Sequence, residues 1–491
     1  MRFRSQLLTL LTIAFLMLAI PGEAGAAPET AAPEVREVTV LLDGLPVAFP
    51  ISPFLEEDVT MAPLRALSES LGFEVLWADE TSPIECVKDG MKISLRLGDA
   101  AVTVEEDGSV RPSNLPKAAH LQGDATVVPL RFFSETLGYK VLWDPETYTA
   151  DVSSPKSDMQ VWGFYALGSL EYPSWEDLFG HKYPYPMLPD PASPASKMAG
   201  AFLGWFAVSP EGSIYSSGHP SGFAKPLGWE AVLLKMRAAE SKPVAMFYAE
   251  NKDGNLSSLL ADRGFRERLA LNMATAVTVD YDGAAVDFEG LGADEATREK
   301  DAANLNAFFE ALKRYLHGSK VYAVVPPVNS AYKGYDHKRL GELSDAVVVM
   351  AYGYEDPSTP SATAPWDRVD EAIRLELEAV PKDKIILGIP GYGTRYSSDG
   401  EIASLEARPA ARDAVGTADA ARVFSPESAS ESIWWQEGDK SFQAFTESNR
   451  SLQARISLAK RYNLRGVAVW RLGFLNPGWW DAVQEVVEPI R

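Results

Sequence analysis

From residue 158 onward, short apolar runs alternate with longer amphipathic stretches. The runs are rich in β-branched and aromatic residues, which favour strands, whereas residues 304–315 and 369–377 have the periodicity of helices. This alternation predicts a parallel sheet, and eight such units in about 330 residues suit a closed (β/α)8 TIM barrel of the α/β class. The predicted strands are residues 161–165, 202–208, 244–248, 283–288, 320–325, 346–352, 384–389 and 466–470.

An open doubly wound sheet is the alternative architecture. Such sheets bind phosphates at a glycine-rich loop after the first strand, and no such loop follows residue 165, so we favour the barrel. Between the last two predicted strands, residues 394–464 are too many for a simple connection and include a strand-like piece at 432–436. We expect an α+β insertion there that forms one wall of a cleft. Its Trp434 and Trp435 fit a sugar platform or a small core equally well.

The segment before residue 154 contains an internal repeat. Thr-Met-Ala-Pro-Leu-Arg at 60–65 recurs as Thr-Val-Val-Pro-Leu-Arg at 126–131, and Ser-Glu, Leu-Gly and Val-Leu-Trp recur at the same offset of 66 residues. Each copy predicts a short helix that ends at Gly72 or Gly138 and is followed by a strand. We therefore predict a small α+β repeat domain at 38–153, a linker near 153–157 and the barrel at 158–491.

These paired units resemble the copper amine oxidase N-terminal-like domain over nearly all of residues 38–153. The resemblance implies a spacer or a wall-associating module and no copper chemistry. We expect Trp77 and Trp143 to lie in its core, and Arg65 and Arg131 to brace the fold.

The first residues have the pattern of an export signal. Arg2 and Arg4 precede an apolar run at 7–20, and Ala-Gly-Ala at 24–26 predicts cleavage after Ala26. An uncleaved membrane anchor is the alternative, but the run is shorter than the roughly 20 residues of a span. We expect a signal peptide at 1–26 and a protein of the cell envelope or exterior that leaves the membrane after cleavage.

The net charge of −22 argues against nucleic acid as a partner. It also argues against charge-driven docking to anionic lipids or acidic wall polymers, so a neutral glycan fits better. Cys86 is the single cysteine, which excludes an internal disulfide, and we interpret it as a small buried residue. No metal or cofactor is predicted, because no metal-ligand spacing joins the histidines at 120, 181, 219, 317 and 337.

Two carboxylates end the fourth predicted strand. Asp287 and Glu289 are two residues apart, so they share a strand face, and the active sites of parallel barrels lie at the carboxyl ends of the strands. If this face looks inward, both enter the barrel mouth, where each disfavours ionisation of the other. A Glu289 that stays protonated at neutral pH is suited to be a general acid.

This strand resembles the signature of glycoside hydrolase family 18, in which three spaced Asp residues precede a Glu. Asp282, Asp287 and Glu289 fit it, whereas Ala285 stands where the family usually has an acidic or amide residue. Further motifs of the family lie at later strand ends: Met-Ala-Tyr at 350–352, Gly-Ile-Pro-Gly-Tyr-Gly at 388–393, and the run that ends at Trp470. The resemblance covers most of 158–491 and is strongest to the spore-germination and cell-wall hydrolase branch.

The resemblance implies substrate-assisted, retaining hydrolysis of β-1,4 bonds in glycans that contain N-acetylglucosamine, either chitin-like or peptidoglycan. Glu289 would protonate the leaving oxygen, and the acetamido oxygen of the substrate would attack C1. Asp287 would hold the acetamido N–H and Tyr352 its oxygen, while Trp470 would stack on the sugar. The remaining candidates for substrate binding are Met350 and Asp282, with Tyr392, Tyr165 and Tyr354 weaker.

Two departures leave other functions open. Ala285 lacks the usual inner group, and Gly353 stands where many family members have Asp, with Glu355 or Asp356 as possible substitutes. A barrel that binds the same glycans without cleaving them is one alternative. A structural envelope protein whose role lies in the repeat domain is another.

Overall fold

The computed structural model describes residues 37–491, except 80–81, 89, 167–173, 183–189, 357 and 407–420. The predicted signal peptide and its cleavage site lie outside the described residues. Among the helices that are described, none has the length and apolar character needed to cross a membrane.

The second part of the chain is a closed barrel of eight parallel strands, as the sequence predicted. Each strand pairs in parallel with the next, and β14 pairs with both β15 and β27, which closes the ring. The strands are β14 (Ser157–Ala166), β15 (Gly200–Val208), β17 (Lys242–Glu250), β18 (Gly283–Glu289), β19 (Lys320–Val325), β20 (Ala346–Val349), β21 (Ile385–Pro390) and β27 (Gly466–Trp470).

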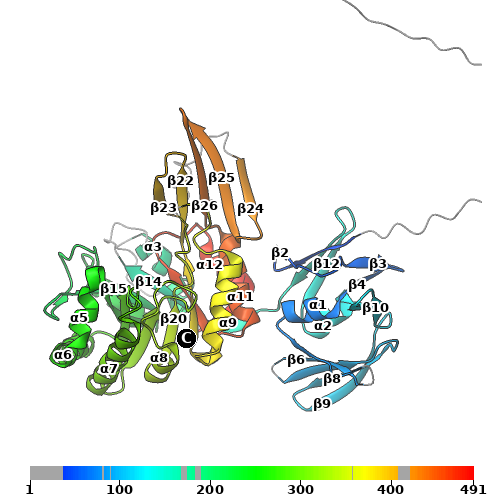
Figure 1. Ribbon diagram of the computed structural model, residues 1–491, viewed down its shortest axis with the longest axis horizontal. Helices are drawn as coiled ribbons and strands as arrows, with labels where there is room; N and C mark the ends of the chain where they lie inside the picture. Colours follow the sequence, from blue (N-terminus) through cyan, green and yellow to red (C-terminus); the bar gives the residue numbers. More distant parts are fainter. Residues whose placement is uncertain are drawn as a thin grey trace, which may run out of the picture. The chain divides into compact units, whose positions relative to one another are not determined.

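Helices surround this barrel on its outer side (Figure 1). Their apolar faces pack against the outward-facing strand residues in one large core. Three of the described helices begin with side-chain caps: Asp262 accepts from the Phe265 backbone N–H, Asp336 accepts from that of Arg339, and Ser448 forms a capping box with Ser451. The described helices are α3 (Ser174–Phe179), α4 (Trp229–Ala238), α5 (Asn255–Ala261), α6 (Arg263–Val277), α7 (Arg298–Leu316), α8 (His337–Leu343), α9 (Trp366–Leu377), α11 (Asn449–Arg461) and α12 (Trp479–Val486).

The barrel interior is filled by side chains and is largely apolar. Trp162 stacks on Phe202 at 4.9 Å between ring centroids, and Tyr322 packs edge-on against Phe202. Ala285 is fully buried in the same cluster. The interior is therefore a packed core below the mouth, and polar groups of the mouth rest on an apolar layer.

The insertion between β21 and β27 contains a five-stranded antiparallel sheet in the order β23-β22-β26-β25-β24. A buried ion pair fixes its base: Arg455 of α11 donates to Glu447, which follows β26, at 2.6 and 3.1 Å. Trp435 stacks on Phe442 at 5.0 Å, whereas Trp434 is 42% exposed. The strands are β22 (Tyr392–Ser397), β23 (Ile402–Glu406), β24 (Ala421–Ser425), β25 (Ser430–Glu437) and β26 (Lys440–Thr446).

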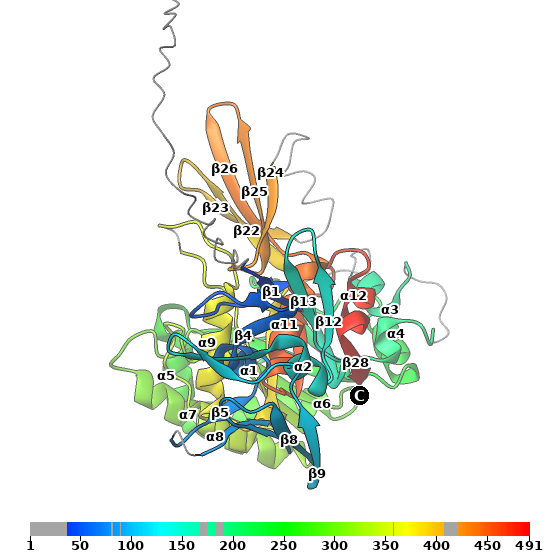
Figure 2. The ribbon, with the colours of Figure 1, turned by 90° about the vertical axis from the view of Figure 1, so that its right-hand side faces the viewer.

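The first part of the chain is rich in strands and contains two short helices (Figure 2). Each helix, α1 (Leu64–Ser70) and α2 (Leu130–Thr136), follows the Pro of its repeat. Gly72 and Gly138 have φ of 81° and 79°, the left-handed conformation that the repeat predicted after each helix. The strands before the helices, β4 (Val59–Pro63) and β11 (Ala125–Pro129), pair with each other antiparallel, so the two copies form one unit.

The expectation that both tryptophans of the repeat lie in the core is wrong for Trp77, which is 44% exposed. It follows β5 (Glu74–Leu76), an edge strand that ends before it, so no neighbouring strand covers its ring. Trp143, within β12 (Lys140–Asp144), is half-buried against the core. Arg131 donates to the Val141 carbonyl at 2.9 Å and so links its helix to the strand that follows. Cys86 is buried, as expected.

Candidate active site

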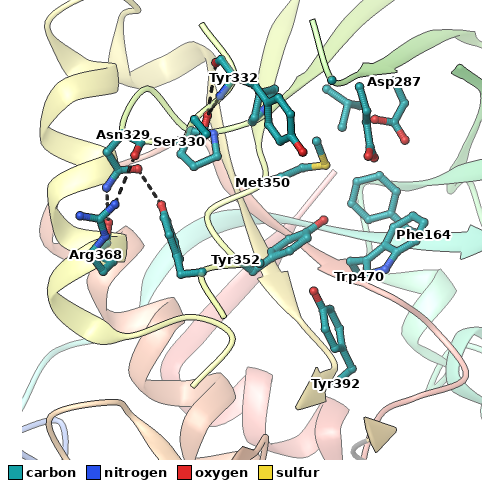
Figure 3. Close-up of a pocket in the computed structure, with 18 residues that line it drawn as sticks. Phe164, Asp287, Asn329, Ser330, Tyr332, Met350, Tyr352, Arg368, Tyr392 and Trp470 are labelled. Carbon is teal, nitrogen blue, oxygen red and sulfur yellow. Dashed lines mark hydrogen bonds between the residues drawn. The ribbon is translucent and has the colours of Figure 1, made fainter. Parts of the chain in front are cut away.

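The carboxyl ends of the barrel strands surround a cavity of about 550 Å³ (Figure 3). Parallel barrels carry their active sites at this end, because the loops that follow the strands converge there. Its lining comes from strands far apart in the sequence, among them β14, β18 and β27. Seven of the nine site candidates that the sequence singled out line it: Asp287, Glu289, Met350, Tyr352, Tyr354, Tyr392 and Trp470.

Alternation along β18 brings the two carboxylates together. Asp287 and Glu289 line the cavity, whereas Val286 and Phe288 lie in the core between the barrel and its helices. Asp287 is 2% exposed. The odd-numbered face of this strand therefore looks inward, as the proposed catalytic pair requires.

Burial dominates the electrostatics of the pair. Burial first, and then the negative charge of nearby Glu250, together raise the pKa of Glu289 to about 7. Burial, followed by the charge of Glu289, raises the pKa of Asp287 well above its ordinary value. Water solvates a carboxylate better than an apolar cavity does, so burial favours the protonated form of each carboxyl over its ionised form. The pair therefore holds a proton at a pH where exposed carboxyls have lost theirs.

Two polar atoms beside Glu289 have no partner among the described residues. Asp287 Oδ1 and the Tyr352 hydroxyl are both buried and unbonded. Burial keeps the pKa of Tyr352 far above its usual value, so its hydroxyl stays a donor. A buried polar group without a hydrogen bond is costly. The site thus presents an unsatisfied acceptor and an unsatisfied donor, which a ligand with both an N–H and a carbonyl oxygen would pair.

The seventh strand makes room for Tyr352. A β-carbon on Gly388 would lie 2.7 Å from the Val349 carbonyl oxygen and 3.0 Å from the ring of Tyr352. Only glycine permits this approach. β20 ends at Val349, earlier than predicted, so Met350 and Tyr352 follow the strand and still reach the cavity. The Tyr392 ring then packs edge-on against Tyr352 with centroids 6.2 Å apart.

Aromatic rings surround Trp470 at the end of the eighth strand. Phe164 meets the indole edge-on at 5.2 Å, and Phe223 lies 6.3 Å from it. Figure 3 shows Phe164 and Trp470 together below Asp287. Trp470 is partly exposed and lines the cavity, so its ring is available to a ligand. Among the described residues, no group of three or more His, Cys, Asp or Glu is arranged to hold a metal ion.

The two departures from the family pattern have distinct surroundings. Ala285 packs in the apolar interior, so Asp287 has no second carboxylate below it on its own strand. Gly353 lines the cavity with φ of 79°, and a β-carbon there would be 3.9 Å from Glu355 Oε2. Glu355 accepts from Thr394 at 2.9 Å. Asp356 is exposed and bonded within its own turn to Ser358.

Two predicted substrate-binding residues lie elsewhere. Tyr165 is fully buried against Trp205 on the helix-facing side of β14, because strand alternation gives the inward position to its neighbour Phe164. Asp282 precedes Gly283, the first residue of β18, and so lies at the opposite end of that strand from Glu289. A strand rises about 3.3 Å per residue, which separates the two by roughly 20 Å.

The sequence interpretation missed one side of the cavity. After β19, the chain contributes Pro326, Asn329 and Tyr332, and the start of α9 contributes Arg368. Tyr354, one of the weaker candidates, lies on this side and donates to Asn329 Oδ1 at 2.8 Å. Strand alternation was a signal for Phe164, but loop residues carry no periodicity that shows where they point.

Comparison with known families divides the chain in the same way. Residues 233–474 match glycosyl hydrolases family 18, and residues 41–152 match the copper amine oxidase N-terminal domain. Among curated relatives, the uncharacterized glycosylase YvbX of Bacillus subtilis is 24% identical over 48% of this chain and 70% of its own length. The cortical fragment-lytic enzyme of Bacillus subtilis is 27% identical over 38% of this chain and 46% of its own length.

Solved structures share the fold. A chitinase from Chromobacterium violaceum superposes with a TM-score of 0.55 at 20% identity, over 67% of this chain and 98% of that one. The spore cortex-lytic enzyme SleL of Bacillus cereus gives a TM-score of 0.56 at 14% identity, over 69% and 77% of the two chains. At these identities the likeness concerns the barrel architecture.

Proposed function

The barrel of this chain belongs to glycosyl hydrolase family 18, and on this premise we propose that the protein cleaves β-1,4 bonds in glycans that contain N-acetylglucosamine. The observation that carries the proposal is the pair of unsatisfied atoms beside Glu289. Asp287 Oδ1 needs a donor and the Tyr352 hydroxyl needs an acceptor. A 2-acetamido group supplies both from one planar unit.

The proposed reaction begins with Glu289 protonated, which its pKa of about 7 permits at neutral pH. Glu289 donates its proton to the glycosidic oxygen while the acetamido oxygen attacks C1, so the C1–O bond breaks and an oxazolinium forms. The leaving sugar departs with the proton. Water then attacks C1, Glu289 takes a proton from it, and the ring opens to restore the acetamide with retained configuration.

The other residues prepare the acetamide. Its N–H donates to Asp287, which favours the ionised form of that carboxyl and leaves the shared proton on Glu289. The Asp287 carboxylate then stabilises the positive charge of the oxazolinium. Tyr352 donates to the acetamido oxygen and aligns it with C1, a form of positioning that lowers the barrier substantially. Trp470 supplies an apolar face for the sugar ring.

The glycan is peptidoglycan or a chitin-like polymer, and export places the enzyme in the cell envelope or outside the cell. The names of the cortical fragment-lytic relatives support the first substrate. Residues 38–153 associate the enzyme with the wall.

A second function, glycan binding without hydrolysis, is favoured by one observation. Ala285 leaves Asp287 on an apolar layer, without the inner group that the family usually has. Such a barrel would hold the same acetamido sugars and release no product.

Incubation of the purified protein with N-acetylglucosamine oligomers and with peptide-free peptidoglycan glycan tests these functions, beside Glu289→Gln. We expect products from the wild type, with retained configuration at first release by NMR, and none from the variant. Substrates with a mono-, di- or trifluoroacetamido group should react progressively more slowly, because fluorine weakens the carbonyl oxygen as a nucleophile. Equal product from wild type and variant would exclude Glu289 as the acid, and binding without product would favour the second function.

A further inference from the structure

Arg368 lies at the end of the cavity opposite the catalytic pair. Figure 3 shows it beside Asn329, with Asp287, Phe164 and Trp470 at the other side. Among the described residues that line this cavity, it is the single basic one. Its side chain is 42% exposed, so the cation is open to a ligand.

Three contacts hold the guanidinium in place. Nη2 donates to the Asn329 carbonyl at 3.2 Å, Nη1 lies 3.3 Å from Glu371 Oε2, and the group sits 5.2 Å from the centroid of the Tyr354 ring. The Asn329 side chain is itself fixed by two hydrogen bonds: it donates to Glu371 and accepts from the Tyr354 hydroxyl. A guanidinium has five N–H groups, and these contacts use two. The remaining donors are preorganised, because the side chain has already lost much of its freedom.

A neutral glycan has no group that requires this cation. A carboxylate does, because arginine binds carboxylates with two parallel charge-assisted hydrogen bonds. The chain carries a net charge of −22, which repels an anionic polymer at long range. Arg368 is already paired with Glu371, so it attracts a carboxylate at short range, through the N–H groups that its present contacts leave unused.

We propose that Arg368 binds a carboxylate carried by the glycan, which makes a carboxylate-bearing 2-acetamido glycan the substrate in preference to a neutral one. This inference rests on the proposed function of the same cavity. The carboxylate belongs either to the 3-O-lactyl group of the glycan or to a peptide attached to that group. The role of Arg368 is substrate selection, and the bond-breaking groups remain Glu289 and Asp287.

The test measures binding in a Glu289→Gln background, so that it does not depend on turnover. The probes are a peptide-free alternating glycan of N-acetylglucosamine and its 3-O-lactyl derivative, the same glycan with its carboxylates converted to amides, and the peptide-bearing glycan. Two of these probes carry carboxylates, the peptide-free glycan on its lactyl groups and the peptide-bearing glycan on its peptides. We expect calorimetry to show that one of these two binds about tenfold more tightly than the amide form, which identifies the carboxylate that Arg368 binds. Adding Arg368→Gln should bring that ratio close to one, and Arg368→Lys should retain part of it.

Arg374→Gln is the matched control, because it removes the same charge from the same helix. Arg374 is exposed and paired with Asp370, and it does not line the cavity. The ratio of the affinities for the carboxylate and amide forms should stay the same after this change. Equal binding of the carboxylate and amide forms, or equal weakening of both by Arg368→Gln, would overturn the inference and leave the proposed function standing. No binding of any glycan would overturn the proposed function itself.

Discussion

Glu250 and Glu289 are neighbours across two parallel strands. They end β17 and β18, and their α-carbons are register partners. Glu250 is exposed, whereas Glu289 lines the cavity. The charge of Glu250 is the second cause, after burial, of the raised pKa of Glu289. The proton of the proposed acid is therefore held partly by a residue of another strand.

Glu250→Gln should lower the pKa of Glu289, because the Glu289 carboxylate would no longer face a nearby negative charge. The acid would lose its proton at a lower pH. The alkaline limb of the profile of kcat against pH should therefore shift to lower pH, by roughly half a pH unit to one pH unit. Glu240→Gln, a change of the same charge at an exposed residue of the barrel's other end, should leave the limb in place. A shift of the alkaline limb to higher pH would contradict the role given to Glu250.

Glu289→Gln should stabilise the fold at high pH. The pKa of Glu289 is raised in the folded state to about 7 from an ordinary 4.5, so the fold favours the protonated form. Its contribution to stability is complete below the ordinary pKa and is lost as the pH rises through 7. At pH 8 the variant should gain roughly 3 kcal/mol in the free energy of unfolding, and near pH 4 much less. Urea denaturation at both pH values measures the difference.

Tyr352→Phe should separate activity from stability. The hydroxyl has no partner among the described residues, so its removal relieves a buried polar group and should raise the free energy of unfolding by about 1 kcal/mol. The value of kcat should fall on the order of 100-fold, because the acetamido oxygen loses its donor.

Tyr354→Phe is the control for that change, since its hydroxyl donates to Asn329 at 2.8 Å. It should lose about 1 kcal/mol of stability. A stability loss for Tyr352→Phe equal to that of the control would show that the Tyr352 hydroxyl is bonded in the free protein.

Gly388→Ala should impair the site through Tyr352. The added carbon would lie 3.0 Å from the tyrosine ring and 2.7 Å from the Val349 carbonyl oxygen, so the ring must move. Displacing the Tyr352 ring from its position in the site should lower kcat by about 100-fold. In a Tyr352→Phe background the further loss should be much smaller, because the hydroxyl that it displaces is already gone. Full additivity of the two changes in kcat would place the effect elsewhere.

Arg455→Met should destabilise the base of the insertion. Arg455 is 1% exposed and is bonded to Glu447 at 2.6 Å, and it also donates to the carbonyls of Ala429 and Ala364. Its loss would leave Glu447 buried and unpaired, which should reduce the free energy of unfolding by about 3–5 kcal/mol. The double variant Glu447→Leu with Arg455→Met should recover part of this loss in chemical denaturation. A double variant as unstable as the single one would contradict the ion-pair explanation.

Most of the fold could be predicted from the sequence. All eight barrel strands were predicted in order, because strands buried on both faces are nearly continuous apolar runs, and the repeat predicted Gly72 and Gly138 as the ends of two helices. The prediction failed where a neighbour decides burial: Trp77 has the composition of a core residue, but β5 is an edge strand and ends before it.

The sequence by itself determined the residues that share a face, since alternation along β18 is a local property: Asp287 and Glu289 point the same way wherever the strand lies. Only the tertiary structure decided what surrounds them. The same alternation gave the inward position on β14 to Phe164 and turned Tyr165 away, and the closed ring set which face looks inward. The raised pKa of Glu289, the place that Gly388 leaves for Tyr352, and the presence of Arg368 in the same cavity all depend on segments far apart in the chain. Burial and proximity are sums over neighbours that no local pattern records.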